Sequence, residues 1–141
     1  MTVGGLLTLL PAVVAACPPE VAAAAAELVD ERHRGATPAE SIYRWLSASR
    51  YRASEHPETV LDVEDFLEVG EGDCKDFSAA AAALALAAGY RVELVATVRG
   101  DYAPHVWARV SDDGGSSWTD IDPTPGAPSF GVPVASVLPA G

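Results

Sequence analysis

Basic side chains are scarce in this sequence. The 141 residues hold 9 lysines and arginines against 20 aspartates and glutamates, which gives a formal net charge of −11. This excess of negative charge argues against binding to nucleic-acid phosphates or anionic lipids, so we expect neither nucleic acid nor a membrane as a partner. The acids are spread without a long run, as is typical of a solubilising surface, although a preference for neutral or basic substrates also fits them.

Cysteine is rare as well. Only Cys17 and Cys74 occur, too few for a disulfide framework in a chain of this length, and we expect both thiols to stay unpaired. The three histidines, His33, His56 and His105, lie beside no closely spaced cysteine pair and form no HExxH motif. The sequence therefore indicates no zinc site, and we expect no metal and no cofactor.

Long hydrophobic runs are also missing. The apolar stretch from Thr2 to Cys17 is too short to span a bilayer. It resembles a signal peptide, with Val14 to Cys17 loosely similar to a lipoprotein cleavage box, but it has no basic region and Pro11 interrupts it. We interpret it as a first helix packed on the domain and predict a cytoplasmic protein. Export, lipid attachment at Cys17 and association with a virus particle stay as alternatives.

Alanine-rich helix signals fill the first half of the chain. Two prolines and an acid at residues 18–20 precede an alanine-rich run, which predicts a helix over Val21 to Glu31. The capping box Thr37-Pro38-Ala39-Glu40 predicts the start of a second helix, whose apolar face includes Trp45. Residues 51–71 are more polar and are predicted to form a loop with one short helix.

A central helix is predicted next. Lys75 to Ala88 is dominated by alanine and leucine and has no polar stripe, which indicates a helix buried on all sides. Gly89 supplies the left-handed residue that commonly ends a helix. Cys74 then lies at or just before the first turn of this helix.

Beyond the central helix, the pattern changes to the period of two that strands show. Residues 91–99, 105–110 and 117–122 alternate in this way, and Asp112 to Gly115 is a tight-turn signal between the last two. Helices followed by an antiparallel sheet define an α+β fold. The length suits one domain, so we predict a single domain over residues 1–141, with a proline- and glycine-rich tail that runs along the surface.

Chemistry is indicated by Cys74 and His105. A cysteine at a helix N-terminus has its thiolate stabilised by unpaired backbone N–H groups, and a neighbouring imidazolium stabilises it further. His105 begins a predicted strand and could supply that imidazolium as a base. Strand alternation places His105 on the face opposite Val106 and Ala108. Taken singly, Cys74 also fits a small core residue and His105 a structural, hydrogen-bonded histidine.

A third group is needed to hold the imidazole through its other nitrogen. Asp120 and Asp122 on the neighbouring predicted strand are two residues apart and share a face, so alternation does not choose between them. Each also fits an ordinary turn acid.

Four ordered segments resemble a known family, the transglutaminase-like superfamily of papain-related cysteine enzymes. They are Gly72-Asp73-Cys74-Lys75-Asp76-Phe77, Ala87-Ala88-Gly89-Tyr90-Arg91-Val92, His105-Val106-Trp107-Ala108-Arg109-Val110 and Trp118-Thr119-Asp120-Ile121-Asp122-Pro123-Thr124. In that family the acid lies four residues after a tryptophan and opens a D-P-T turn. The resemblance thus selects Asp122 and implies a Cys74, His105 and Asp122 triad, with a core at about residues 20–125 and a tail at 126–141.

The resemblance implies acyl transfer on the amide bonds of a protein or peptide substrate. It favours hydrolysis by a peptidase or amidase, with deamidation or cross-linking as alternatives. The calcium sites and β domains of animal transglutaminases have no counterpart here. The family's oxyanion donor upstream of the cysteine is not identifiable, which leaves the Cys74 backbone N–H as the one donor we name. Trp45 fits core packing. A catalytically silent structural or binding module of a larger assembly, for example in a phage, is the competing hypothesis.

Overall fold

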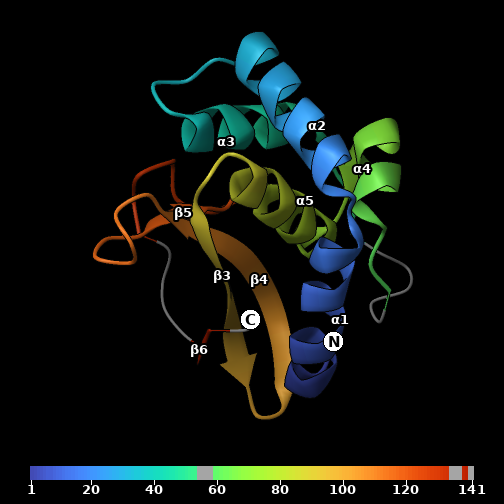
Figure 1. Ribbon diagram of the computed structural model, residues 1–141. Helices are drawn as coiled ribbons and strands as arrows, with labels where there is room; N and C mark the ends of the chain where they lie inside the picture. Colours follow the sequence, from blue (N-terminus) through green and yellow to red (C-terminus); the bar gives the residue numbers. More distant parts are fainter. Residues whose placement is uncertain (54–58, 134–137, 140–141) are drawn as a thin grey trace.

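We analysed a computed structural model of the chain. It describes residues 1–53, 59–133 and 138–139, so His56 and parts of the tail lie outside the described residues. The elements in chain order are α1 (Val3–Ala16), α2 (Pro19–Arg32), α3 (Pro38–Ala48), β1 (Arg50–Tyr51), α4 (Val63–Val69), β2 (Glu71–Gly72), α5 (Cys74–Ala87), β3 (Arg91–Arg99), β4 (Tyr102–Ser111), β5 (Thr119–Ile121) and β6 (Leu138–Pro139). Helices lead and an antiparallel sheet follows, which confirms the predicted α+β fold (Figure 1).

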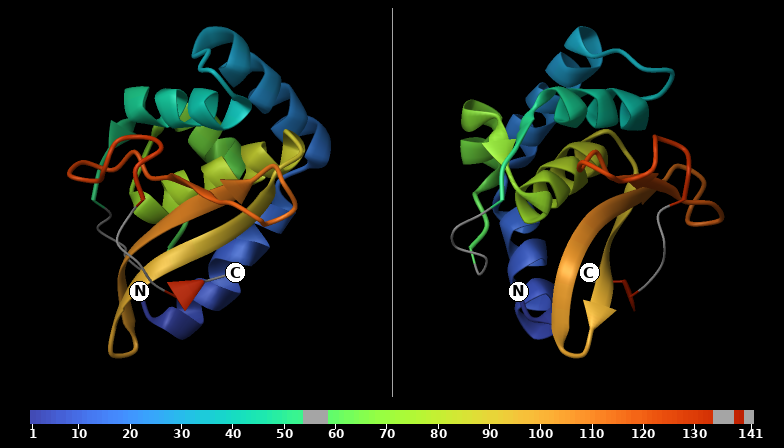
Figure 2. Two further views of the ribbon diagram at one scale, coloured as in Figure 1. Left: turned by 90° about the vertical axis from the view of Figure 1, so that its left-hand side faces the viewer. Right: turned by 180° about the vertical axis from the view of Figure 1, so that it is seen from behind.

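The main sheet has the strand order β5-β4-β3-β6, and every pairing in it is antiparallel. The long β3–β4 hairpin forms its centre and curves around the helices, as the two views of Figure 2 show. A second, parallel ladder joins β1 to β2 just before α5. Helix α5, which begins with Cys74, packs directly on β4, the strand that carries His105.

Helix α5 is the centre of the core, as its composition predicts. It packs on β3 and β4 and also contacts α1, α2, α3 and α4. Its residues from Cys74 to Ala85 are all buried. Alanine side chains let four helices approach this one closely, because they add little volume at the interfaces. The large buried side chains come from the elements around it: Leu6, Leu10, Ile42, Leu46, Phe66, Val106 and Trp107.

The N-terminal predictions hold with small changes. Residues 3–16 form α1, which packs on the domain through Leu6, Leu10 and Val13. Thr37 caps α3 by accepting a hydrogen bond from the Glu40 N–H at 3.2 Å. In the described part of the chain no single helix is long and apolar enough to cross a membrane; only α1 and α2 taken together, bent by 84° at their junction, have the required length and composition.

Three short strands were not predicted. Residues 51–71 were expected to be a loop with a short helix; α4 is that helix, but β1 and β2 flank it as a parallel ladder. The tail was expected to run along the surface, whereas Leu138–Pro139 pairs with Val95 and Ala96 at the edge of the main sheet. Strands of two residues have no measurable alternation, so a periodic pattern does not reveal them.

The turn at Asp112 to Gly115 fixes the pairing of β4 with β5. Asp113 accepts hydrogen bonds from the hydroxyls of Ser111 at 2.6 Å and Ser117 at 2.5 Å. These two bonds hold the pKa of Asp113 well below its usual range. Ser111 also accepts the Gly115 N–H at 2.9 Å, and Gly115 has a φ of +96°, a conformation that glycine adopts without strain. The closed turn sets the register that brings the end of β5 toward His105.

Candidate active site

Cys74 is the first residue of α5. Asp73 caps the helix by accepting the N–H groups of Lys75 at 2.9 Å and Asp76 at 3.2 Å, and Asp76 accepts the Asp73 N–H in return at 2.9 Å. This is a reciprocal capping box. A Cβ atom at Gly72 would lie 2.6 Å from the Cβ of Asp76, so the turn before Cys74 has no room for a larger residue.

The acidic cap beside Cys74 is neutralised locally. The Lys75 ammonium lies 2.6 Å from a carboxylate oxygen of Asp73, and both side chains are almost fully buried. An unpaired carboxylate at this position would oppose a thiolate, because two like charges at close range repel strongly in a buried setting. The Lys75–Asp73 pair removes that opposition while keeping the helix capped.

A hydroxyl ties the cysteine helix to the histidine strand. Ser78 lies one turn into α5, and its Oγ lies 2.5 Å from the Cys74 carbonyl and 3.1 Å from the Val106 carbonyl in β4. Both carbonyls are acceptors for the Ser78 hydroxyl. Since Val106 follows His105 directly, this contact sets the first turn of α5 against the part of β4 that carries the histidine.

His105 lies between a carboxylate and a thiol. Its Nε2 is 2.7 Å from Oδ2 of Asp122, whose side chain is 2% exposed. Burial acts to lower the pKa of His105, but hydrogen bonds with the Asp122 and Cys74 side chains outweigh it and raise the pKa to about 10. Asp122 is itself held by the Thr124 hydroxyl, which donates to its Oδ1 at 2.7 Å. His105 and Asp122 are thus in direct contact, and Cys74 lies close enough to affect the pKa of His105.

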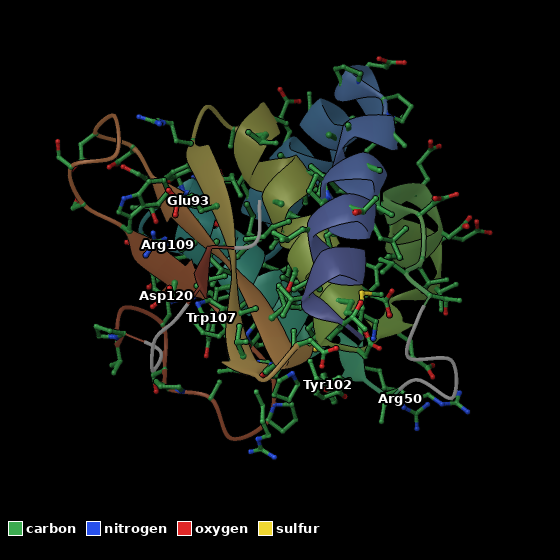
Figure 3. All side chains as sticks on the ribbon, turned by 90° about the horizontal axis from the view of Figure 1, so that it is seen from below. Arg50, Glu93, Tyr102, Trp107, Arg109 and Asp120 are labelled. Carbon is green, nitrogen blue, oxygen red and sulfur yellow. The ribbon has the colours of Figure 1, made fainter. Side chains whose placement is uncertain are left out.

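Asp120 has a different contact. Its Oδ1 accepts a hydrogen bond from the Trp107 indole N–H at 2.9 Å. Asp120 lies opposite Arg109 in the β4–β5 register, but its side chain contacts Trp107, two residues earlier on β4. Asp122 is offset from His105 in the same diagonal way. Figure 3 labels Trp107, Asp120 and Arg109 along this part of the sheet. The two acids share a face, as predicted, but only Asp122 contacts the imidazole.

Tyr51 is the residue that sequence reasoning missed. The β1–β2 ladder pairs it with Gly72, and its ring packs edge-on against Phe77 at 5.7 Å between centroids. Burial raises the pKa of its hydroxyl, negative charge on Cys74, Asp73 and Asp122 adds to the rise, and a hydrogen bond with the Cys74 backbone opposes it. The phenol therefore lies at the N-terminus of α5 and keeps its proton, while its oxygen accepts the hydrogen bond from the Cys74 backbone N–H. The segment before the cysteine block gave no signal beyond one aromatic residue.

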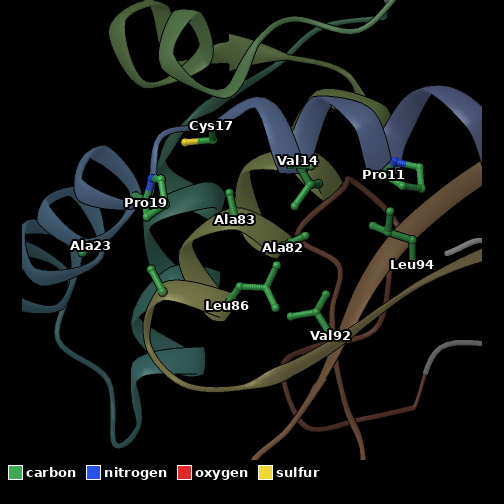
Figure 4. A pocket seen from close by; sticks show the side chains of 13 residues that line it. Pro11, Val14, Cys17, Pro19, Ala23, Ala82, Ala83, Leu86, Val92 and Leu94 are labelled. Carbon is green, nitrogen blue, oxygen red and sulfur yellow. The ribbon is translucent and has the colours of Figure 1, made fainter.

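Other residues from the sequence analysis lie elsewhere. Trp45 packs edge-on against Phe66 with ring centroids 5.7 Å apart, in agreement with a core role. Cys17 is buried and unpaired, and it lines an apolar cavity of about 660 Å³ between α1, α2, α5 and β3. Figure 4 shows this cavity against the later turns of α5, where Ala82 and Leu86 lie. Among the described residues, no three His, Cys, Asp or Glu side chains are grouped to hold a metal ion.

Comparison with known proteins identifies the family and supports the fold. The model of the transglutaminase-like superfamily matches residues 22–123, well over half of the chain. No curated protein matches. Among solved structures, the crystal structure of a putative protease from Parabacteroides distasonis is similar, with a TM-score of 0.65 and 14% identity. The match covers 87% of this chain and 26% of that protein, so this chain spans about a quarter of the other's length.

The fold and the family match define the class of protein. The central helix begins with Cys74 and packs on the antiparallel sheet that carries His105. The chain belongs to the transglutaminase-like superfamily.

Proposed function

We propose that this protein catalyses acyl transfer on amide bonds, with Cys74 as nucleophile, His105 as general acid and base, and Asp122 as the orienting acid. The observation that carries the proposal is the hydrogen bond of 2.7 Å between His105 and Asp122, on the part of β4 that Ser78 ties to the first turn of the cysteine helix. The Asp122 and Cys74 side chains together raise the pKa of His105. A cysteine at a helix N-terminus beside an imidazolium is the arrangement that favours a reactive thiolate.

The proposed reaction has two steps. The Cys74 thiolate attacks the amide carbonyl carbon, and His105 passes its proton to the departing amine as the C–N bond breaks. The resulting thioester is then attacked by water, whose proton returns to His105, and the acid and free thiolate are released. Because Asp122 is bonded to Nε2, Nδ1 is the ring nitrogen that serves Cys74 and the substrate.

One side-chain donor flanks the position of the developing oxyanion in this proposal, the hydroxyl of Tyr51. Its oxygen accepts a hydrogen bond from the Cys74 backbone N–H, which leaves the phenol proton to be donated to the oxyanion. A donor held beforehand at this position stabilises the tetrahedral intermediate because charge appears there only during the reaction. The raised pKa of Tyr51 keeps its proton available throughout the physiological range.

Replacing Tyr51 with phenylalanine is therefore expected to lower kcat by about a hundredfold, the usual cost of losing one oxyanion donor, with little change in KM. Steady-state kinetics on a cleaved peptide measure this. Tyr102→Phe is the matched control, because Tyr102 is exposed and pairs with Arg99 and Thr2 at the β3–β4 hairpin. A loss below about threefold in Tyr51→Phe, or an equal loss in the control, contradicts the donor role.

Hydrolysis is the proposed outcome, and the substrate class is a peptide or protein. The similar crystal structure is described as that of a putative protease, which supports a hydrolytic activity. Incubating the protein with a peptide library, with and without a primary amine, and reading the products by mass spectrometry tests this. We expect shortened peptides or free acids. Amine adducts alone would show that the reaction is cross-linking instead of hydrolysis. No product from any peptide, together with an unreactive Cys74, would favour a silent module.

A further inference from the structure

One side of the His105 imidazole is covered by an indole. The ring of Trp107 stacks on that of His105 with centroids 5.6 Å apart and planes inclined by 27°. Trp107 is 2% exposed, and its N–H donates to Asp120 at 2.9 Å. Asp122 thus contacts the imidazole at its edge and Trp107 contacts its face, while Asp120 contacts only Trp107.

These two contacts constrain different motions of the ring. A hydrogen bond at Nε2 fixes one atom of the imidazole and still allows the ring to turn about the bond to Asp122. A stacked aromatic plane restricts that turn. It also favours the protonated form, because a cation over an indole face is attracted by the negative potential of the ring.

We propose that Asp120 is a positioning residue for the reaction proposed above: its carboxylate holds the Trp107 indole by the N–H, and the indole in turn holds the His105 imidazolium against its face. The inference rests on the proposed function, since the imidazolium matters only if His105 serves Cys74. It assigns Asp120 a part distinct from that of Asp122, although both acids lie on one strand face.

The surrounding charges leave a second explanation to exclude. Asp122 follows β5, Cys74 begins α5, and the Arg109 guanidinium pairs with Glu93 across β4 and β3 while it lies 5.0 Å from the Trp118 ring. In this setting Asp120 could also act on His105 through its negative charge alone. Asparagine separates the two cases, because its carbonyl accepts the indole N–H without the charge.

The experiment follows the ring nitrogens of His105 by NMR from pH 5 to 11 in the full chain, with the signals assigned through His105→Gln. In the unsubstituted protein the imidazolium should persist to about pH 10. Asp120→Asn should titrate as the unsubstituted protein does. Asp120→Leu should titrate lower by about half to one pH unit, the size of a cation–π contact. Asp112→Leu, which removes an exposed acid of the neighbouring turn, should change nothing.

Trp107→Phe is the decisive second variant. It tests the same contact if Asp120→Leu does not fold. It keeps an aromatic face but lacks the N–H, so it should reproduce the shift of Asp120→Leu, and in its background Asp120→Asn should add nothing. Equal shifts in Asp120→Asn and Asp120→Leu would overturn the proposal in favour of charge, and no shift in either would overturn it outright. If His105 of the unsubstituted protein titrates near 6.5, the proposed function itself fails, which is a separate result.

Discussion

Asp122→Asn is expected to lower turnover by about ten-thousand-fold, the cost of the equivalent change in serine proteases. Asp122 accepts from Nε2 of His105, which leaves Nδ1 to serve the Cys74 thiol. An asparagine carbonyl can accept from Nε2 but carries no negative charge, and its NH₂ group would favour the wrong imidazole tautomer, so the imidazolium loses the stabilisation that the carboxylate gives. Comparison of kcat/KM for the two proteins on one peptide measures the effect, and circular dichroism checks that the buried site still folds.

Asp120→Asn is the matched control, because it removes the same charge two residues away. Its carbonyl can still accept the Trp107 N–H, so we expect a change of less than about tenfold. The reverse ranking, with Asp120→Asn inactive and Asp122→Asn active, would transfer the orienting role to Asp120. It would also show that the family pattern, in which the orienting acid lies four residues after a tryptophan, does not select the right acid in this chain.

Cys74→Ala is expected to abolish activity, while Cys17→Ala should leave it unchanged. The two thiols lie in opposite surroundings. Burial raises the pKa of Cys17, and the nearby charges of Glu64 and Glu20 raise it further, so this thiol stays protonated. Cys74 instead lies beside a protonated histidine. Full activity of Cys74→Ala on any cleaved peptide would remove the nucleophile from the proposal.

The long elements were predictable because several local signals agree in each. Helix α5 has a cap before it, a uniform apolar composition and Gly89 with a φ of +95° after it, and the structure places it at Cys74–Ala87. Strand β3 matches residues 91–99 as predicted. Strand β5 is shorter than the predicted 117–122, because Ser117 is drawn into the turn by Asp113.

The site was predictable only in part. Alternation correctly placed Asp120 and Asp122 on one face, but the choice between them depends on a diagonal contact across the β4–β5 pair, which a periodic pattern does not contain. The family resemblance supplied that choice. Tyr51 was missed because its position depends on a two-residue parallel ladder between residues 21 positions apart in the sequence.

The pH dependence of Cys74 alkylation tests the central claim most directly, since it needs no substrate. Iodoacetamide would be added to the Cys17→Ala protein at pH 5 to 11, and the rate read from the intact mass. We predict labelling already at pH 6, with a second change near pH 10 where His105 loses its proton. In His105→Gln the labelling at pH 6 and the change near pH 10 should both be lost, because the neighbouring imidazolium is gone. If His105→Gln and the protein with His105 intact give the same curve, Cys74 and His105 do not act as a pair and the enzymatic proposal is contradicted.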